Sequence, residues 1–143
     1  MELFVRAELD EAPGIGLRLV LMDAQVQPAG HELEPDHSVT DEWQALSLLV
    51  DEIALDELGE SSVLLASGVV EPGLYERVFV RARSIDAVGA DGIMIAVENL
   101  LEPIALPFRA RGRSSLELVL TAVPKVGSQR VLLVAAKETR VLR

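Results

Sequence analysis

The sequence has no cysteine, few aromatic residues and no long apolar run, and each absence excludes a class of site or structure. Without cysteine the chain forms no disulfide and no thiolate metal site. One Trp, one Tyr and three Phe leave the core mostly to Leu, Val, Ala and Ile. No apolar run reaches the about 18 residues of a membrane helix, so we expect no membrane span. The 143 residues, half of them apolar, suit a single domain over residues 1–143.

Basic side chains are also scarce, and they are unevenly distributed. The net charge of −10 argues against nucleic acid as a partner, because the phosphates would be repelled. Residues 1–71 carry 16 acidic and 2 basic side chains, or −14, whereas residues 72–143 carry 7 and 11, or +4. The simpler interpretation is that the two halves lie side by side and pair their charges. The alternative is a two-sided surface that guides head-to-tail self-association.

Alternating apolar and polar residues predict β-strands separated by turns. Residues 2–9 alternate, and residues 17–26 are apolar on both faces, which is typical of a central strand. Prolines place the segment 102–108 at a sheet edge. Short strands at intervals of roughly ten residues indicate an all-β fold, an antiparallel β-sandwich of about seven to eight strands with at most one short helical turn. The other expected strands are 75–84, 93–97, 116–123 and 130–136.

The segment 61–75 combines an apolar cluster with a turn. Residues 61–68, SSVLLASG, fit one helical turn that a serine caps and Gly68 ends. In the following EPGLY, Pro72 fixes φ and Gly73 is free to take a positive φ, which predicts a chain reversal before the next strand.

The strongest metal or catalytic candidates lie in one polar loop. His31, Glu34, Asp36 and His37 offer imidazole and carboxylate groups of the kind that bind divalent cations. Their spacing matches no established ligand motif, so a solvated loop is the favoured interpretation. The carboxylates of residues 51–60 likewise fit a solvated acidic face. No nucleophile elbow or phosphate-binding glycine loop is present, so we expect neither an enzyme nor a cofactor.

A basic loop follows the predicted edge strand. Its arginines are Arg109, Arg111 and Arg113. Such a cluster is suited to gripping a carboxylate or a phosphate. Pairing with the acidic half of the chain is the simpler interpretation.

The last predicted strand is apolar on both faces. Val131, Leu133 and Ala135 make its outer face apolar as well as its inner one. Such a strand is either central in its sheet or meets another subunit. Assembly by strand addition is therefore one hypothesis.

The order of the motifs resembles an uncharacterised bacterial and archaeal family, the domain of unknown function number four-three-eight-two. This resemblance implies an exported, often lipoprotein-like protein with an Ig-like β-sandwich related to the prealbumin and carboxypeptidase-regulatory group. The chain departs from the family in showing no export signal and no lipid-anchor cysteine. The segments that carry the resemblance are AELDEAP (7–13), EWQALSLL (42–49), IALDELGESSVLLASGVVEPGLYERVFV (53–80) and SSLELVLTAVPKVGSQRVLLVAA (114–136).

The resemblance also decides two local questions. Residues 40–59 have an approximately helical stripe, but the family pattern favours strands there. The resemblance also implies that the segment 61–75 is an architectural unit that closes one end of the core. Its expected members are Leu64 and Leu65 as a plug, Gly68, Pro72 and Gly73 in the reversal, and Tyr75 as a corner tyrosine.

These observations predict a non-enzymatic structural, adhesion or ligand-binding module of the cell envelope. One alternative is a self-assembling subunit of an extracellular filament or oligomer, built by strand pairing. A less favoured alternative is a metal-dependent enzyme that uses the His31–His37 loop. The expected partner is a protein, and a second copy of the chain is one candidate. The expected location is extracellular or the envelope if an export signal has been removed, and otherwise the cytoplasm.

Overall fold

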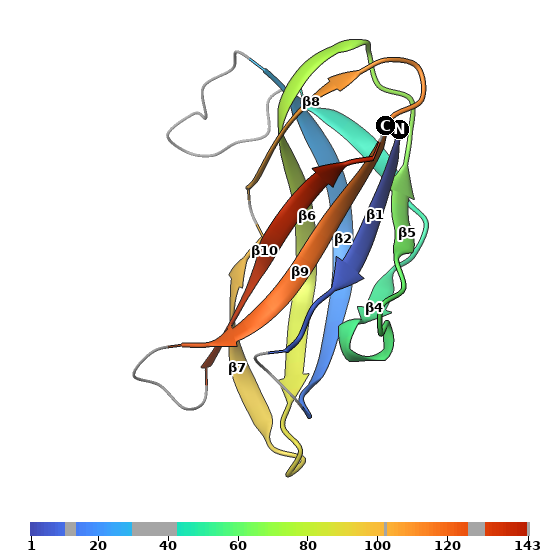
Figure 1. The fold of residues 1–143 in the computed structure, drawn as a ribbon. Helices are drawn as coiled ribbons and strands as arrows, with labels where there is room; N and C mark the ends of the chain where they lie inside the picture. The colour runs from blue at the N-terminus through green and yellow to red at the C-terminus, as the bar shows by residue number, and fades with distance from the viewer. Residues whose placement is uncertain (11–13, 30–42, 102, 126–130, 143) are drawn as a thin grey trace.

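The computed structural model describes residues 1–10, 14–29, 43–101, 103–125 and 131–142. These residues form ten strands and one short 3-10 helix (Figure 1). No helix in the described part of the chain has the length and apolar character to cross a membrane. The elements are β1 (Glu2–Ala7), β2 (Gly16–Pro28), β3 (Gln44–Leu48), β4 (Glu52–Ala54), η1 (Leu55–Glu57), β5 (Val63–Ser67), β6 (Gly73–Val88), β7 (Met94–Leu100), β8 (Ile104–Ala110), β9 (Ser115–Pro124) and β10 (Val131–Val141).

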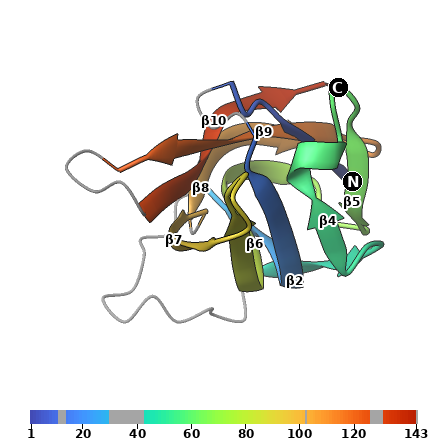
Figure 2. The same cartoon turned by 90° about the horizontal axis from the view of Figure 1, so that it is seen from below.

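The strands close into a barrel. Eight of them form a ring in the order β2-β3-β5-β1-β9-β10-β7-β6, and β6 pairs back with β2. The two remaining strands lie outside this ring, β4 against β2 and β8 against β6. Figure 2 looks at the barrel from one end, with β2 and β6 on the wall opposite β9 and β10. The barrel is mixed, because β1 is parallel to β9 and β10 is parallel to β7.

The prediction of an antiparallel, Ig-like β-sandwich is therefore wrong, and two short pairings explain why. β3 pairs with β2 and also with β5, through Ser47 with Ser67 and Leu48 with Ala66. β7 pairs with β10 and also with β6, the latter through Ala87 with Ile95 and Val88 with Met94. β3 and β7 are therefore the corner strands of the barrel: each pairs with both of the walls that a sandwich would leave as separate sheets. Register shifts along the β2–β6 pair add bends and twist, which help a sheet to curve round on itself.

Alternate side chains of the strands fill the barrel with aliphatic groups, as the composition predicts. β8 shows the alternation clearly: Ile104, Leu106 and Phe108 are buried, whereas the residues between them are exposed. The 3-10 helix η1 contributes Leu55 to the core. The largest fully buried side chains are Leu3, Leu17, Leu19, Leu55, Leu65, Leu101, Leu116, Leu118, Leu120, Val5, Val26 and Val78.

Several local predictions have a clear outcome. The central position of β2 is confirmed, because it pairs with β3 and β4 on one side and with β6 on the other. The edge position of β8 is confirmed by its place at the end of the strand order. The expectation of strands over residues 40–59 is confirmed for β3 and β4 but not for Leu55–Glu57, which form the 3-10 helix η1, and residues 40–42 lie outside the described residues. The helical turn expected at 61–68 is wrong, because Val63–Ser67 is β5, which pairs with β1 along its length.

Candidate functional site

The barrel has two ends that differ in charge, and β6 connects them. At one end Gly73 of β6 pairs with Ala110 of β8, and at the other Val88 of β6 pairs with Gly16 of β2. At about 3.3 Å per residue, the 16 residues of β6 separate these ends by roughly 50 Å. Figure 1 shows the β8–β9 connection and both chain termini at the first end, and the β6–β7 hairpin at the second.

The first end carries the three arginines that the sequence singled out. Arg109 is the last outward-facing position of β8, and Arg111 and Arg113 lie in the turn that leads into β9. The backbone N–H of Arg111 donates to Ser114 Oγ at 3.3 Å, and the N–H of Glu2 donates to the Ser114 carbonyl at 2.9 Å. The turn is therefore tied both to itself and to the first strand. We call Arg109, Arg111 and Arg113 the arginine end.

These arginines do not pair with the acidic half of the chain in the part that the structure describes. All three side chains are exposed, and no ion pair or hydrogen bond among the described residues involves their guanidinium groups. The predicted pairing between the two halves is found elsewhere, at Arg81 with Asp23 and at Lys137 with Glu8.

The corner motif lies beside the arginine end, because Gly73 pairs with Ala110 and Tyr75 with Phe108. The Tyr75 hydroxyl donates to the backbone carbonyl of Glu71 at 2.6 Å, and the Tyr75 ring stacks on Phe108 with 5.1 Å between centroids. Burial raises the pKa of Tyr75 above its ordinary value. Gly73, after Pro72, has a φ of 148° at the start of β6, which supports the predicted reversal. Because Phe108 directly precedes Arg109, this stacked pair fixes the backbone that carries the arginines.

Two predicted members of the motif behave differently from expectation. Leu65 is fully buried in the core, but Leu64 is only half-buried, so the two leucines do not form a plug together. Gly68 has no positive φ; instead, a Cβ at this position would lie 3.2 Å from Leu46 Cδ2. Glycine is therefore suited to this position because β3 packs closely against it.

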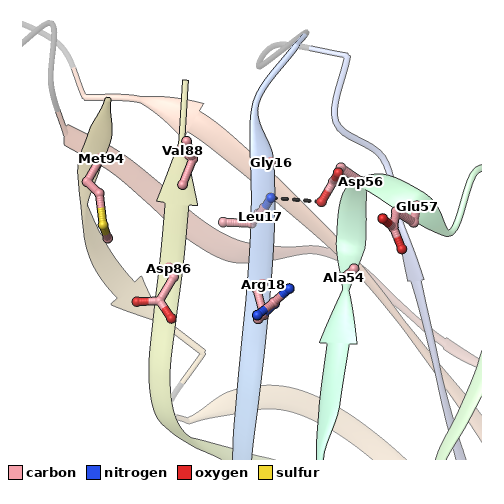
Figure 3. A pocket seen from close by; sticks show the side chains of 9 residues that line it. All are labelled: Gly16, Leu17, Arg18, Ala54, Asp56, Glu57, Asp86, Val88 and Met94. Carbon is pink, nitrogen blue, oxygen red and sulfur yellow. Dashed lines mark hydrogen bonds between the residues drawn. The ribbon is translucent and has the colours of Figure 1, made fainter. Parts of the chain in front are cut away.

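The second end of the barrel is acidic. Asp56 Oδ1 accepts a hydrogen bond from the Leu17 N–H at 2.8 Å, which ties η1 to the start of β2 (Figure 3). Asp86, Asp56 and Glu57 line a hollow of about 500 Å³ there (Figure 3), and Asp56 also borders a second hollow of about 540 Å³. We call the following exposed carboxylates the acidic end: Asp10, Asp56, Glu57, Glu60, Asp86 and Asp91.

The acidic end confirms the solvated acidic face expected for residues 51–60, and it extends that face. No carboxylate of the acidic end takes part in an ion pair within the described residues. Among these residues, no three His, Cys, Asp or Glu side chains are placed to hold a metal ion. The metal candidates His31, Glu34, Asp36 and His37 lie outside the described residues.

The last strand is central rather than an edge. β10 lies between β9 and β7, and both of its edges are paired over residues 131–135. Leu132 and Val134 enter the core, whereas Val131, Leu133 and Ala135 form a half-buried outer face. Of the two explanations for a strand that is apolar on both faces, the central position in the sheet is therefore the one observed. Residues 131–135 have no unpaired edge for strand addition.

Comparison with family models, with curated proteins and with solved structures returned no match. The resemblance to the domain of unknown function, and the envelope location that it implies, stay predictions. The fold itself defines the chain as an all-β protein with a closed, mixed, eight-stranded barrel. The sequence identified the arginines and allowed a two-sided charged surface as one interpretation, but only the strand register places the arginines and the carboxylates at opposite ends.

Proposed function

We propose that this chain is a non-catalytic binding module that holds an acidic protein surface at the arginine end. The observation that carries the proposal is the set of three exposed guanidinium groups, Arg109, Arg111 and Arg113, which have no acceptor within the described residues. Arginine presents its N–H donors in a planar fork that matches a carboxylate, and such pairs are among the stronger hydrogen bonds in proteins. Single exposed ion pairs contribute little, so the three must act together.

The surroundings of the arginines favour a protein partner. Leu74, which pairs with Arg109 across the β6–β8 ladder, is 54% exposed, and Val69 in the connection before β6 is 99% exposed. A protein surface combines carboxylates with apolar groups that can cover such side chains.

Binding of an acidic polypeptide tests this function, with poly-L-glutamate as the probe. We expect labelled poly-L-glutamate to bind the wild-type chain in about 20 mM salt, and to bind much less in about 300 mM salt, because screening weakens exposed charge pairs. Arg111→Glu should weaken this binding about tenfold, since it removes one fork and adds a repulsive charge; a tenfold change is about 1.4 kcal/mol. Fluorescence anisotropy measures both effects.

Arg83→Glu is the matched control. Arg83 is exposed on β6, and its side chain makes no ion pair or hydrogen bond with another described residue. It lies outside the arginine end. The substitution changes the net charge by the same amount as Arg111→Glu, and it should leave binding nearly unchanged. Equal loss in the two variants, or no binding by the wild type, would contradict the proposed function.

A further inference from the structure

The chain carries, at its other end, the kind of surface that the arginine end is expected to hold. We infer that the partner is a second copy of this chain, which docks its acidic end against the arginine end, head to tail. This inference rests on the proposed function and names its partner. Three observations support it: the charges of the two ends, their placement and their shapes.

The charges are complementary where the two copies would meet. The acidic end presents six exposed carboxylates among the described residues. Arg18 lines the first hollow and is paired with Glu52 at 2.7 Å. Arg6 lines the second hollow and is paired with Glu8 at 3.0 Å. Among the described residues, the arginine end presents three guanidinium groups and two exposed carboxylates, Glu2 and Glu71. Within the described residues the two ends thus differ in the sign of their local charge, although the whole chain is strongly acidic.

The placement of the ends makes the contact between copies possible. Because roughly 50 Å of β6 separates them, the two ends of one copy cannot reach each other. Attraction must therefore act between molecules. Two different surfaces meet in such a contact, which makes it heterologous, and repetition produces an open chain of subunits.

The shapes of the two ends also fit. Arg111 and Arg113 lie in the exposed β8–β9 turn and Arg109 lies at the end of β8, whereas the acidic end has two hollows of about 500 and 540 Å³ that both border Asp56. An exposed turn can place its arginine side chains in such hollows, where they face Asp56, Glu57 and Asp86 (Figure 3). The net charge of −10 on each copy opposes approach at long range, so we expect weak association that depends strongly on salt.

Sedimentation velocity over a range of protein concentrations tests the inference. In about 20 mM salt the average mass of the wild type should rise with concentration, and in about 300 mM salt it should stay that of a monomer. Arg111→Glu and Glu57→Arg should each weaken self-association about tenfold, whereas Arg83→Glu should not. Glu57 is used because Asp56 also holds the Leu17 N–H.

Mixing the two variants gives the sharpest result. Arg111→Glu retains an intact acidic end, and Glu57→Arg retains an intact arginine end, so one native contact can form between them. An equimolar mixture should therefore associate more strongly in low salt than either variant does alone. Urea unfolding of each variant checks that both retain the wild-type stability.

Three outcomes would overturn the inference. Self-association that is insensitive to salt and to Arg111→Glu would place the contact elsewhere on the barrel. If Arg83→Glu weakened self-association as much as Arg111→Glu, the change in net charge alone would explain the result. A wild type that stays monomeric while poly-L-glutamate still binds would show that the acidic partner is another protein, and the proposed function would stand. A wild type that neither self-associates nor binds poly-L-glutamate would contradict the proposed function as well.

Discussion

Val134→Asp is expected to abolish the folded state at neutral pH, or to lower the free energy of unfolding by at least about 4 kcal/mol. Val134 is fully buried on β10, where it faces the core between β9 and β7. An aspartate there is either charged without a partner or protonated at a raised pKa, and a shift of 3 units alone costs about 4 kcal/mol. A domain of this kind has a total stability of about 5–15 kcal/mol. Urea unfolding followed by circular dichroism measures the loss.

The same substitution three positions earlier provides the control. Val131 is half-buried on the outer face of β10, so Val131→Asp should cost no more than about 1 kcal/mol. The penalty at position 134 should also shrink as the pH falls from about 7 to about 4, because the carboxyl then becomes neutral in the unfolded chain as well as in the folded state. Equal effects of the two substitutions would contradict the assignment of the inner and outer faces of β10.

Leu118→Ala has the second-largest expected effect, a loss of about 2–5 kcal/mol in the free energy of unfolding. Leu118 is fully buried on β9, opposite Val5 of β1 and Thr139 of β10. Truncation removes buried methyl groups and leaves a cavity that strands paired on both sides cannot easily collapse. Leu49→Ala removes the same atoms from a side chain that is 52% exposed, and it should cost less than about 1 kcal/mol. Similar losses for the two leucines would contradict the position of the core.

Much of the local structure could be predicted from the sequence, because period-two alternation depends only on which side chains face the core. The strand β1 follows this rule, whereas β2 could be predicted from apolar residues on both of its faces. The prolines around β8 fit its edge position because proline cannot donate to a strand ladder. The corner tyrosine was also predictable. The turn at Pro72 and Gly73 precedes Tyr75 at the spacing that lets the hydroxyl reach back to Glu71.

Closure of the barrel could not be predicted in the same way. A sandwich and a barrel bury the same alternate side chains, and they differ only in whether the corner strands pair with both walls. Here that choice is made by pairs such as Ser47 with Ser67 and Ala87 with Ile95. These residues carry no turn signal or pattern that distinguishes the two folds. The strand at 63–67 was missed because its serines and Gly68 are also typical of helix ends.

The candidate site shows the same division between local and global information. The sequence revealed the three arginines and the acidic segment 51–60. Two interpretations of the uneven charge distribution followed from it: pairing between the two halves of the chain, or a two-sided charged surface. The choice depends on where β6 places the ends of the barrel, which is a property of the register between distant strands. The carboxylates Asp86 and Asp91 join the acidic end only through this register.

The most direct test of the account is an NMR titration of the isotope-labelled chain with its unlabelled copy in low salt. We predict that the amide signals of residues 109–113 and 56–60 shift together with increasing concentration, and that those of residues 131–135 on β10 do not. Added salt should reverse the shifts. Shifts confined to residues 131–135, with the signals of both charged ends unchanged, would contradict the claim that this barrel binds through its ends.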